Sequence, residues 1–252
     1  ARRQRQMCIR DRRLTGKQIG SKYGFIANGL FQSEEEIANS ATVKGYKALP
    51  GYIKYVDRNG DGIITAAQDQ GYVGKSATPK HTGSLNLFGN WKGFDFDLLF
   101  SWGLGNVVAL TGQYTASGSV GTQDNTSFTK PFYHGGNSPT FLVENSWTPD
   151  NTNAEFPRLE ISGPSNNNGF SSTFWYRNGN YMRLKTAQIG YNFPKKWLTP
   201  AGIEGLRLYV EGYNLLTFSG LTKYNIDPES PAVNNGYYPQ QRTYTLGVKL
   251  TF

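Results

Sequence analysis

Phe94-Asp95-Phe96-Asp97-Leu98-Leu99-Phe100-Ser101-Trp102 is the stretch of the sequence that decides the fold. Side chains along a β-strand point alternately to its two faces, so every second residue shares a face. One face of this stretch is wholly aromatic or aliphatic, whereas the other carries two carboxylates, a leucine and a hydroxyl. The pattern predicts a strand that separates an apolar environment from a polar one.

Four further strands are predicted around this one. Lys92-Gly93 is typical of a tight turn and joins the first stretch to a strand over residues 84–91. The other three are expected over residues 181–193, 206–218 and 242–252. The last alternates strictly between large apolar residues and threonine, glycine or lysine, and it ends on Phe252. We therefore expect an all-β, antiparallel fold.

The connections between these strands alternate in length. Residues 92–93 and 194–205 form short connections, whereas residues 103–178 and 219–241 form long ones. Outer-membrane barrels have short periplasmic turns, long external loops and strands of about 9–11 residues. If the last strand ends in the periplasm, every connection falls on the side that suits its length. We thus expect strands of a transmembrane β-barrel with long extracellular loops and a periplasmic C-terminus. The terminal Phe252 resembles the signal read by the outer-membrane barrel assembly machinery; the alternative is a buried terminal strand in a soluble protein.

The composition agrees with a fold of this kind. The chain of 252 residues is 14% aromatic and 37% hydrophobic, and it contains 30 glycines. Its mean hydropathy is −0.53 and no run approaches 18 apolar residues, which excludes a transmembrane helix.

The first 13 residues differ from the rest. They carry six Arg and one Asp, a net charge of +5 out of the +8 of the whole chain. Met7-Cys8-Ile9-Arg10-Asp11-Arg12 resembles the translated read-through of a sequencing adapter, so we expect residues 1–13 to be non-native. The alternative is a basic arm for nucleic acid, a partner that we do not expect. Cys8 is the only cysteine, which leaves no disulfide framework.

Residues 14–83 are expected to form an extracellular loop region, and residues 84–252 the barrel strands with their loops. Ser33 followed by Glu36 predicts the capped start of a short helix. Pro50-Gly51 predicts a turn, and a short strand is expected over residues 52–56.

Residues 57–69, which we call the acidic loop, begin with Asp57–Gly62, a stretch that resembles the opening of a calcium loop. Oxygen-bearing side chains stand at its first, third and fifth positions and glycine at the sixth, as a sharp calcium-binding turn requires. The twelfth position holds Gln68, and the closing carboxylate comes one residue later. Structural calcium is the one cofactor considered; the alternative is an Asn-Gly and Asp-Gly turn with exposed carboxylates. The candidate ligands are Asp57, Asn59, Asp61, Ile63, Thr65 and Asp69.

Catalytic patterns are weak. Asp95 and Asp97 share a strand face at about 7 Å, and two neighbours on one strand cannot easily flank a sugar ring. They suit a water-facing barrel wall instead. His81 and His134, the only histidines, lie in no ligand-spaced or catalytic pattern. We therefore expect no enzyme.

From Gly16 onward the chain resembles the C-terminal third or quarter of SusC/RagA-family transporters, in order and spacing over about 235 residues. The strings that carry the resemblance are Gly16–Phe25, Gly29–Ile37, Pro50–Tyr55, Asp57–Gly62, Trp147–Ala154 with Pro157-Arg158, Tyr181–Lys185, Gly190–Pro194, Asn214-Leu215, Asp227-Pro228-Glu229 and Tyr244–Phe252.

The resemblance implies a function that the strand pattern alone does not. Such proteins are TonB-dependent outer-membrane transporters with 22-stranded barrels and an N-terminal plug, and they import oligosaccharides or peptides with a SusD-like surface lipoprotein. It implies outer-membrane lipid and the TonB complex as further partners, the latter through an N-terminal part that we expect this chain to lack. The alternative is a secreted, calcium-containing, carbohydrate-binding β-sandwich, in which the apolar strand faces would be buried.

Aromatic residues in the expected external loops are candidates for contacting a glycan or the lipoprotein, because aromatic rings suit the apolar faces of sugars. The alternative is loop packing or the aromatic girdle at the membrane interface. The candidate substrate-binding residues are Trp147, Trp175, Tyr237 and Tyr238.

Overall fold

The computed structural model describes residues 16, 19–74, 76–110, 140–159, 167–230 and 240–252. They fold as two compact units. The loop-rich unit contains the described residues of 1–77 and 107–177, and the sheet unit those of 78–106 and 178–252. Residues 84–252 are predicted from the sequence to form the barrel strands with their loops. The described part of residues 107–177 packs into the loop-rich unit.

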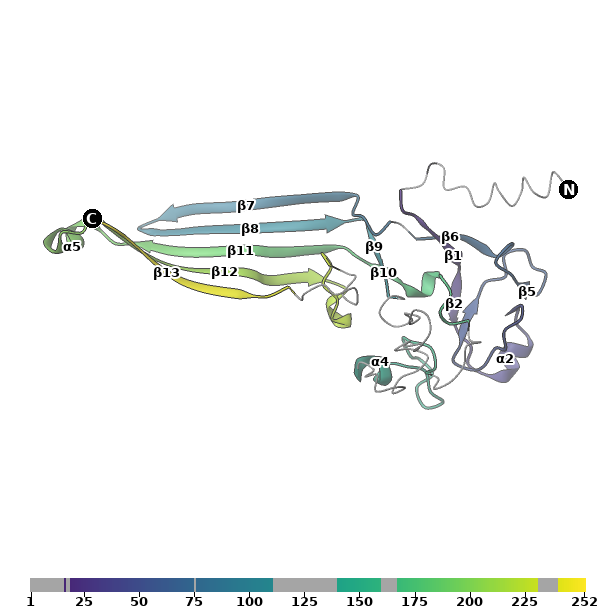
Figure 1. The fold of residues 1–252 in the computed structure, drawn as a ribbon. Coiled ribbons are helices and arrows are strands. Elements are labelled where there is room, and N and C mark those ends of the chain that lie inside the picture. The colour runs from purple at the N-terminus through teal and green to yellow at the C-terminus, as the bar shows by residue number, and fades with distance from the viewer. Residues whose placement is uncertain (1–15, 17–18, 75, 111–139, 160–166, 231–239) are drawn as a thin grey trace, which may run out of the picture. The chain divides into compact units, whose positions relative to one another are not determined.

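The sheet unit is built on five antiparallel strands in the order β13-β12-β11-β8-β7 (Figure 1). Strands that follow one another along the chain pair with one another, so the sheet is a meander with one long insertion after β8. All five predicted strands are confirmed, with ends that move by at most three residues. Their bounds are His81–Trp91 for β7, Phe94–Leu104 for β8, Tyr181–Asn192 for β11, Gly205–Ser219 for β12 and Thr243–Thr251 for β13.

The connections at one end of the sheet are short and well defined. Lys92 and Gly93 join β7 to β8, and both have positive φ, 50° and 92°. Two residues with positive φ form the mirror-image turn that matches the twist of a hairpin. The connection between β11 and β12 contains α5 (Lys195–Leu198) and η3 (Thr199–Ala201), and it closes on Gly202 in the left-handed conformation.

The pairing register places large apolar residues on one face of the sheet. One cross-strand row on this face aligns Trp91 with Phe94, Tyr191, Leu208 and Val248. The ring centres of Phe94 and Tyr191 lie 4.7 Å apart. The register shifts between Leu184 and Thr186 in β11: Lys185 is an extra residue relative to β8, whereas two residues of β12, Asn214 and Leu215, lie opposite it. Such a bulge restores the alternation of faces beyond it, and it explains why β11 does not alternate strictly in sequence.

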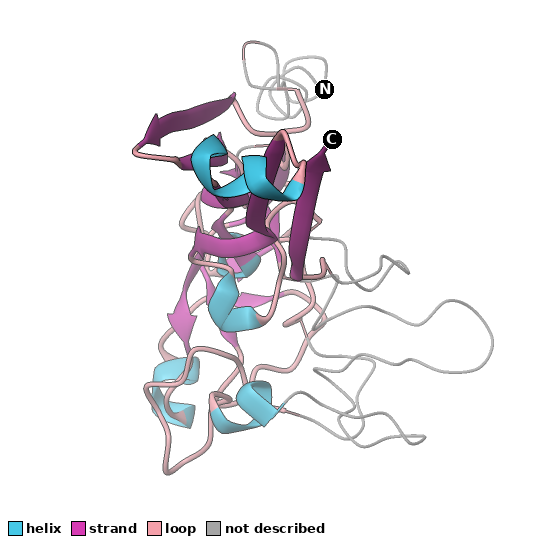
Figure 2. Cartoon of the chain, turned by 90° about the vertical axis from the view of Figure 1, so that its left-hand side faces the viewer, coloured by secondary structure: helices cyan, strands magenta, loops and turns pink. Residues whose placement is uncertain are grey.

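The loop-rich unit is made of short elements. The described residues contain no helix with the length and apolar character needed to cross a bilayer, and the helices are only short segments (Figure 2). The paired strands are β1 (Lys22–Phe25) with β6 (Gln70–Gly74), β2 (Ala27–Leu30) with β4 (Ile53–Tyr55), β3 (Thr42–Val43) with β5 (Ile63–Ile64), and β9 (Val107–Ala109) with β10 (Tyr176–Asn178). The helical segments are α2 (Glu34–Ala38), α4 (Thr140–Glu144) and η2 (Thr173–Trp175).

A buried aromatic core holds this unit together. Phe25, on β1, lies 5.1 Å from the ring of Tyr55 and 5.6 Å from that of Phe170. Phe156 and Trp175 have no exposed surface and stack at 6.5 Å. Full burial of one large apolar side chain contributes about 1.5–3 kcal/mol, so contacts between residues far apart in the sequence account for much of the stability of this unit.

The predicted N-cap of α2 is confirmed. The Ser33 hydroxyl accepts the backbone N–H of Glu36 at 3.1 Å, and the Glu36 carboxylate accepts the N–H of Gln32 at 2.8 Å. The first bond satisfies a backbone donor that the first turn of a helix leaves free, and the second ties the residue before the N-cap to the same turn.

Candidate functional site

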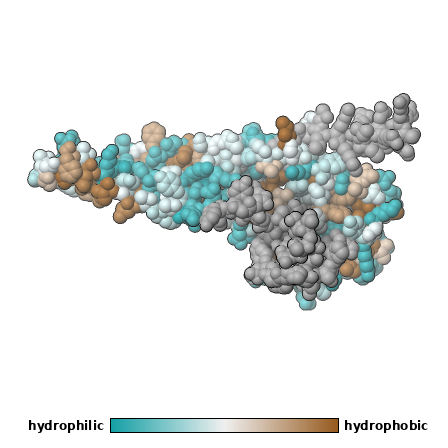
Figure 3. Space-filling model, viewed as in Figure 1, coloured by the Kyte–Doolittle hydropathy of each residue, from teal (hydrophilic) through white to brown (hydrophobic). Residues whose placement is uncertain are grey.

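The most prominent functional feature is the amphipathic five-stranded sheet. On its apolar face Tyr244 is 71% exposed, Leu246 77% and Val210 55%. Brown, apolar residues lie on the surface of the sheet unit toward the end that carries α5 (Figure 3). Soluble monomers rarely expose a contiguous apolar surface of this kind, so the face is suited to contact with another apolar phase or protein.

The opposite face carries a polar network near the α5 end. Arg207, on β12, forms an ion pair with Asp95 on β8, through its Nε at 3.0 Å from Oδ2 and through its Nη2 to Oδ1. Its Nη2 also donates to Gln188 Oε1 at 2.8 Å, and Asn192 Nδ2 donates to Asp95 Oδ2 at 2.7 Å. The guanidinium lies 4.9 Å from the centre of the Tyr209 ring. Asp95 is therefore bound into the wall of the sheet, the arrangement expected of a polar lining.

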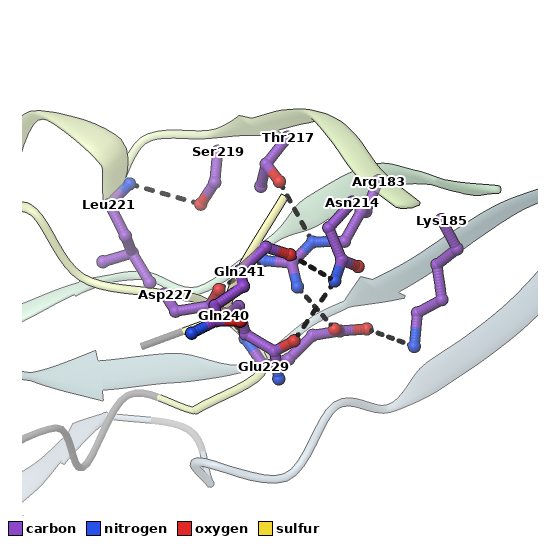
Figure 4. A network of polar contacts seen from close by, with 10 residues as sticks. All are labelled: Arg183, Lys185, Asn214, Thr217, Ser219, Leu221, Asp227, Glu229, Gln240 and Gln241. Atoms are coloured by element: carbon purple, nitrogen blue, oxygen red, sulfur yellow. Dashed lines mark hydrogen bonds and ion pairs between the residues drawn. The ribbon is translucent and has the colours of Figure 1, made fainter. Parts of the chain in front are cut away.

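A second network on the same face lies at the other end of the sheet (Figure 4). Arg183, on β11, is only 2% exposed. It donates through Nε to Thr217 Oγ1 at 3.0 Å, through Nη2 to Asp227 Oδ2 at 2.6 Å and through Nη1 to Glu229 Oε2 at 2.8 Å. Lys185 Nζ lies 3.0 Å from Glu229 Oε1. We call Arg183, Lys185, Asp227 and Glu229 the Arg183 latch.

From the sequence, the residues of the Arg183 latch were noted only within strings that resemble the transporter family, and no role was predicted for them. Arg183 and its two carboxylate partners are 44 and 46 residues apart. The one available signal was an arginine on the polar side of a strand, followed by a connection with two acids.

The acidic loop is closed by its own side chains. Asp57 accepts the backbone N–H groups of Gly60 and Gly62, each at 2.7 Å, and Asp61 Oδ1 accepts that of Ile63 at 2.8 Å. The N–H of Gly62, the strongest contributor, and other loop amides hold the pKa of Asp57 below its usual range. The carboxylate of Asp57 is therefore stabilised as an anion by the turn itself.

The closing carboxylate of this loop, Asp69, is bound to backbone amides of the same loop. Asp69 has no exposed surface, and its two oxygens accept the backbone N–H groups of Arg58 at 2.9 Å and Thr65 at 2.7 Å. Among the described residues, no three Asp, Glu, His or Cys side chains gather closely enough to hold a metal ion. The residues fit a calcium shell in part: Asp57, Asn59 and Asp61 line the turn, whereas Asp69 is engaged elsewhere.

The candidate substrate-binding aromatic residues have different positions. Trp147 is 6% exposed, donates from Nε1 to Gln32 Oε1 at 2.9 Å, and lines a cavity of about 460 Å³ together with Arg158 and Glu34. Trp175 has no exposed surface and donates from Nε1 to the Asn168 carbonyl at 2.7 Å. A buried ring offers no platform for a sugar, so we assign Trp175 to the core. Tyr237 and Tyr238 lie outside the described residues, as does His134.

Comparisons with known proteins agree with this geometry. No family model matches the chain. The TonB-dependent receptor P3 of Formosa agariphila is 32% identical over 94% of this chain and 22% of the receptor. The receptor P26 of the same organism is 28% identical over 96% of the chain and 23% of that receptor. The chain thus spans about a fifth of the length of these relatives.

Two solved structures of the RagAB system share this fold. The RagAB peptide transporter matches over 92% of this chain and 22% of its own, with a TM-score of 0.58 and 22% identity. The RagAB peptide importer in its closed-closed state gives a TM-score of 0.58 at 24% identity. With the curated relatives and the amphipathic antiparallel sheet, these likenesses lead to one assignment. The chain belongs to the TonB-dependent receptors.

Proposed function

We propose that the chain is the C-terminal part of the barrel wall of a TonB-dependent outer-membrane transporter. The observation that carries this proposal is the five-stranded meander with an exposed apolar face and a polar face. In an outer-membrane barrel the apolar face contacts lipid and the polar face lines the interior. The two edge strands, β7 and β13, would pair with further strands, because lipid does not tolerate open sheet edges.

The dimensions of the strands support this proposal. The five strands have 9 to 15 residues, and a tilted transmembrane strand needs about 9–11. The connections 92–93 and 193–204 lie at one end of the sheet, and the longer ones, 105–180 and 220–242, at the other. We assign the first end to the periplasm, with the C-terminus, and the second to the cell exterior. Closure with 22 strands is part of the same proposal.

The loop-rich unit is proposed to be extracellular. The chain enters the sheet at His81, which pairs with Leu104 at the end that has the long connections. Residues 14–83 therefore reach the sheet from the side assigned to the exterior. We propose residues 84–252 as the strand-bearing part, although the described residues of 107–177 pack with the loop-rich unit.

The cargo and partners follow from the family. We propose import of oligosaccharides or peptides with a SusD-like lipoprotein, driven through TonB by a part outside this chain. RagAB is described as a peptide transporter, which supports the peptide alternative. Reading the flanking locus would test this: an upstream plug-encoding region and a neighbouring lipoprotein gene are expected, and nearby glycosidase or peptidase genes would indicate the cargo.

The sandwich alternative is disfavoured by the exposed apolar face, since a sandwich would bury it under a second sheet. The test uses spin labels at two neighbouring positions of β12 in the full outer-membrane protein, freed of other cysteines. Oxygen, which enters lipid, should speed the relaxation of a spin label at Val210→Cys. A water-soluble nickel complex should instead speed the relaxation of a label at Glu211→Cys. A Val210 label shielded from both reagents would contradict the barrel proposal.

A further inference from the structure

The segment after β12 folds back onto the polar face of the sheet. Leu221, Tyr224 and Ile226 are at most 3% exposed, so the segment has an apolar anchor of its own. The short helix η4 (Thr222–Tyr224) ends at Asn225, whose φ of 55° reverses the chain. Residues 221–230, which we call the return segment, are thus packed against the sheet and do not extend away from it.

The return segment presents two carboxylates side by side. Asp227 Oδ1 accepts the backbone N–H of Glu229 at 2.8 Å, which fixes a tight turn. The other oxygen of Asp227 and both oxygens of Glu229 then bind the cations of β11, Arg183 and Lys185. The extra residue at the β11 bulge is Lys185 itself, so the irregularity supplies the second cation.

The position of Arg183 identifies the face on which the segment lies. In the pairing register Arg183 is aligned with Ser101 and Thr217, and Ser101 with Ser84, all on the polar face. The Arg183 side chain is 2% exposed, and those of Asp227 and Glu229 are 20% and 17% exposed. Removal of one member of such a pair leaves a poorly hydrated charge, so the ion pairs hold the segment firmly.

We propose that the Arg183 latch holds the return segment inside the barrel as a fixed ledge that narrows the external end of the transport path. This inference rests on the proposed function, because the polar face must line the lumen. The latch joins two cations to two carboxylates, so the ledge adds no net charge from these groups. It therefore restricts cargo by size, and the return segment, residues 221–230, acts as an internal constriction.

The test measures how far reagents of different size reach beneath the ledge. A single cysteine replaces Thr245, which lies on the polar face between the Arg183 row and the end that carries α5, in the full outer-membrane protein freed of other cysteines. A small maleimide and a large polyethylene-glycol maleimide are applied to intact cells. Arg183→Met should raise labelling by the large reagent about tenfold, because the buried ion pairs no longer hold the segment. The milder change Asp227→Asn should raise it by less.

Arg207→Met is the matched control. It removes a half-buried arginine and its ion pair with Asp95 from the same face of the sheet, at a position that the return segment does not reach. It should leave labelling by both reagents unchanged. Equal labelling by the large reagent with and without Arg183 would overturn the ledge while leaving the barrel intact. Failure of even the small reagent in every variant would overturn both the ledge and the proposed lumen. Heat-modifiable migration on gels checks that each variant has folded, and Asp227→Asn decides the matter if Arg183→Met does not fold.

Discussion

Glu36 connects three parts of the loop-rich unit through one carboxylate. Its Oε1 lies 2.8 Å from Lys54 Nζ on β4, and its Oε2 accepts the N–H of Gln32. The hydrogen bond from Lys54, and then that from Gln32, lower the pKa of Glu36 below its ordinary value of 4.5. A carboxylate with a lowered pKa in the folded state contributes stability above its unfolded pKa. That contribution is lost as the pH falls through the folded value.

We therefore predict that α2 loosens as the pH falls below about 4.5. Hydrogen exchange of residues 33–39, corrected for the intrinsic effect of pH, should speed up in this range. In Glu36→Gln the same exchange should be faster at neutral pH and nearly independent of acidification. An unchanged pH response in the variant would show that another group controls this segment. Glu34→Gln, on the same helix, is the control.

The acidic loop allows a second prediction at the residue scale. Asp57, Asn59 and Asp61 line a turn of the calcium-loop type, but Asp69 is bound to backbone amides. We expect weak calcium binding, with a Kd on the order of 10⁻⁴–10⁻³ M, as in extracellular modules. Terbium luminescence sensitised by nearby tyrosines, with calcium as competitor, would measure it. Asp61→Asn should abolish the signal; no luminescence in the unmodified protein would remove calcium from the account.

Local residue patterns predicted some of these features and missed others. The Ser33 cap and the 92–93 turn depend on residues within four positions of one another, so the sequence revealed them. The Arg183 latch and the burial of Trp175 depend on contacts between distant segments. A pattern of neighbours carries no information about such contacts, and the sequence placed Trp175 among surface candidates for that reason.

At the scale of elements, strand alternation was the reliable signal. It predicted five strands because one apolar face and one polar face repeat with period two. It gave no elements within residues 103–178, which show no periodicity and were expected to be a long connection. The described part of this segment instead contributes β9, α4, η2 and β10, and its Phe156 and Trp175 belong to the core. Short elements stabilised by tertiary packing leave little trace in local propensity.

The β7–β8 hairpin gives a prediction at this scale. Gly93 has a φ of 92°, and an added Cβ would lie 3.0 Å from the Asn192 carbonyl oxygen. A side chain in the left-handed region costs about 1–2 kcal/mol, so Gly93→Ala should lower the yield of heat-modifiable barrel in the outer membrane. Lys92→Asn, at the other turn position, should leave the yield unchanged or raise it, because asparagine accepts positive φ readily. Equal yields for both variants would contradict this assignment of the turn.

At the scale of the whole molecule, the sheet has two unsatisfied requirements. Its apolar face is exposed, and its edges β7 and β13 have no further partner strand among the described residues. Each requirement has a separate physical cause: one is apolar surface in water, and the other is a row of open backbone donors and acceptors. A closed barrel in a bilayer meets both at once, whereas a second covering sheet meets only the first.

We predict that the chain of 252 residues, expressed alone with a secretion signal, does not form a soluble monomer. The open edges and the exposed apolar face should drive aggregation, which size-exclusion chromatography and thioflavin fluorescence would detect. Replacing Leu246 and Val248 by Thr on β13 should reduce aggregation if the apolar face is the main cause. The same replacements in the full outer-membrane protein should impair assembly, because they then face lipid. A soluble, folded monomer of the unmodified chain would instead favour the carbohydrate-binding sandwich, since only a protein that buries this face internally needs no membrane around it.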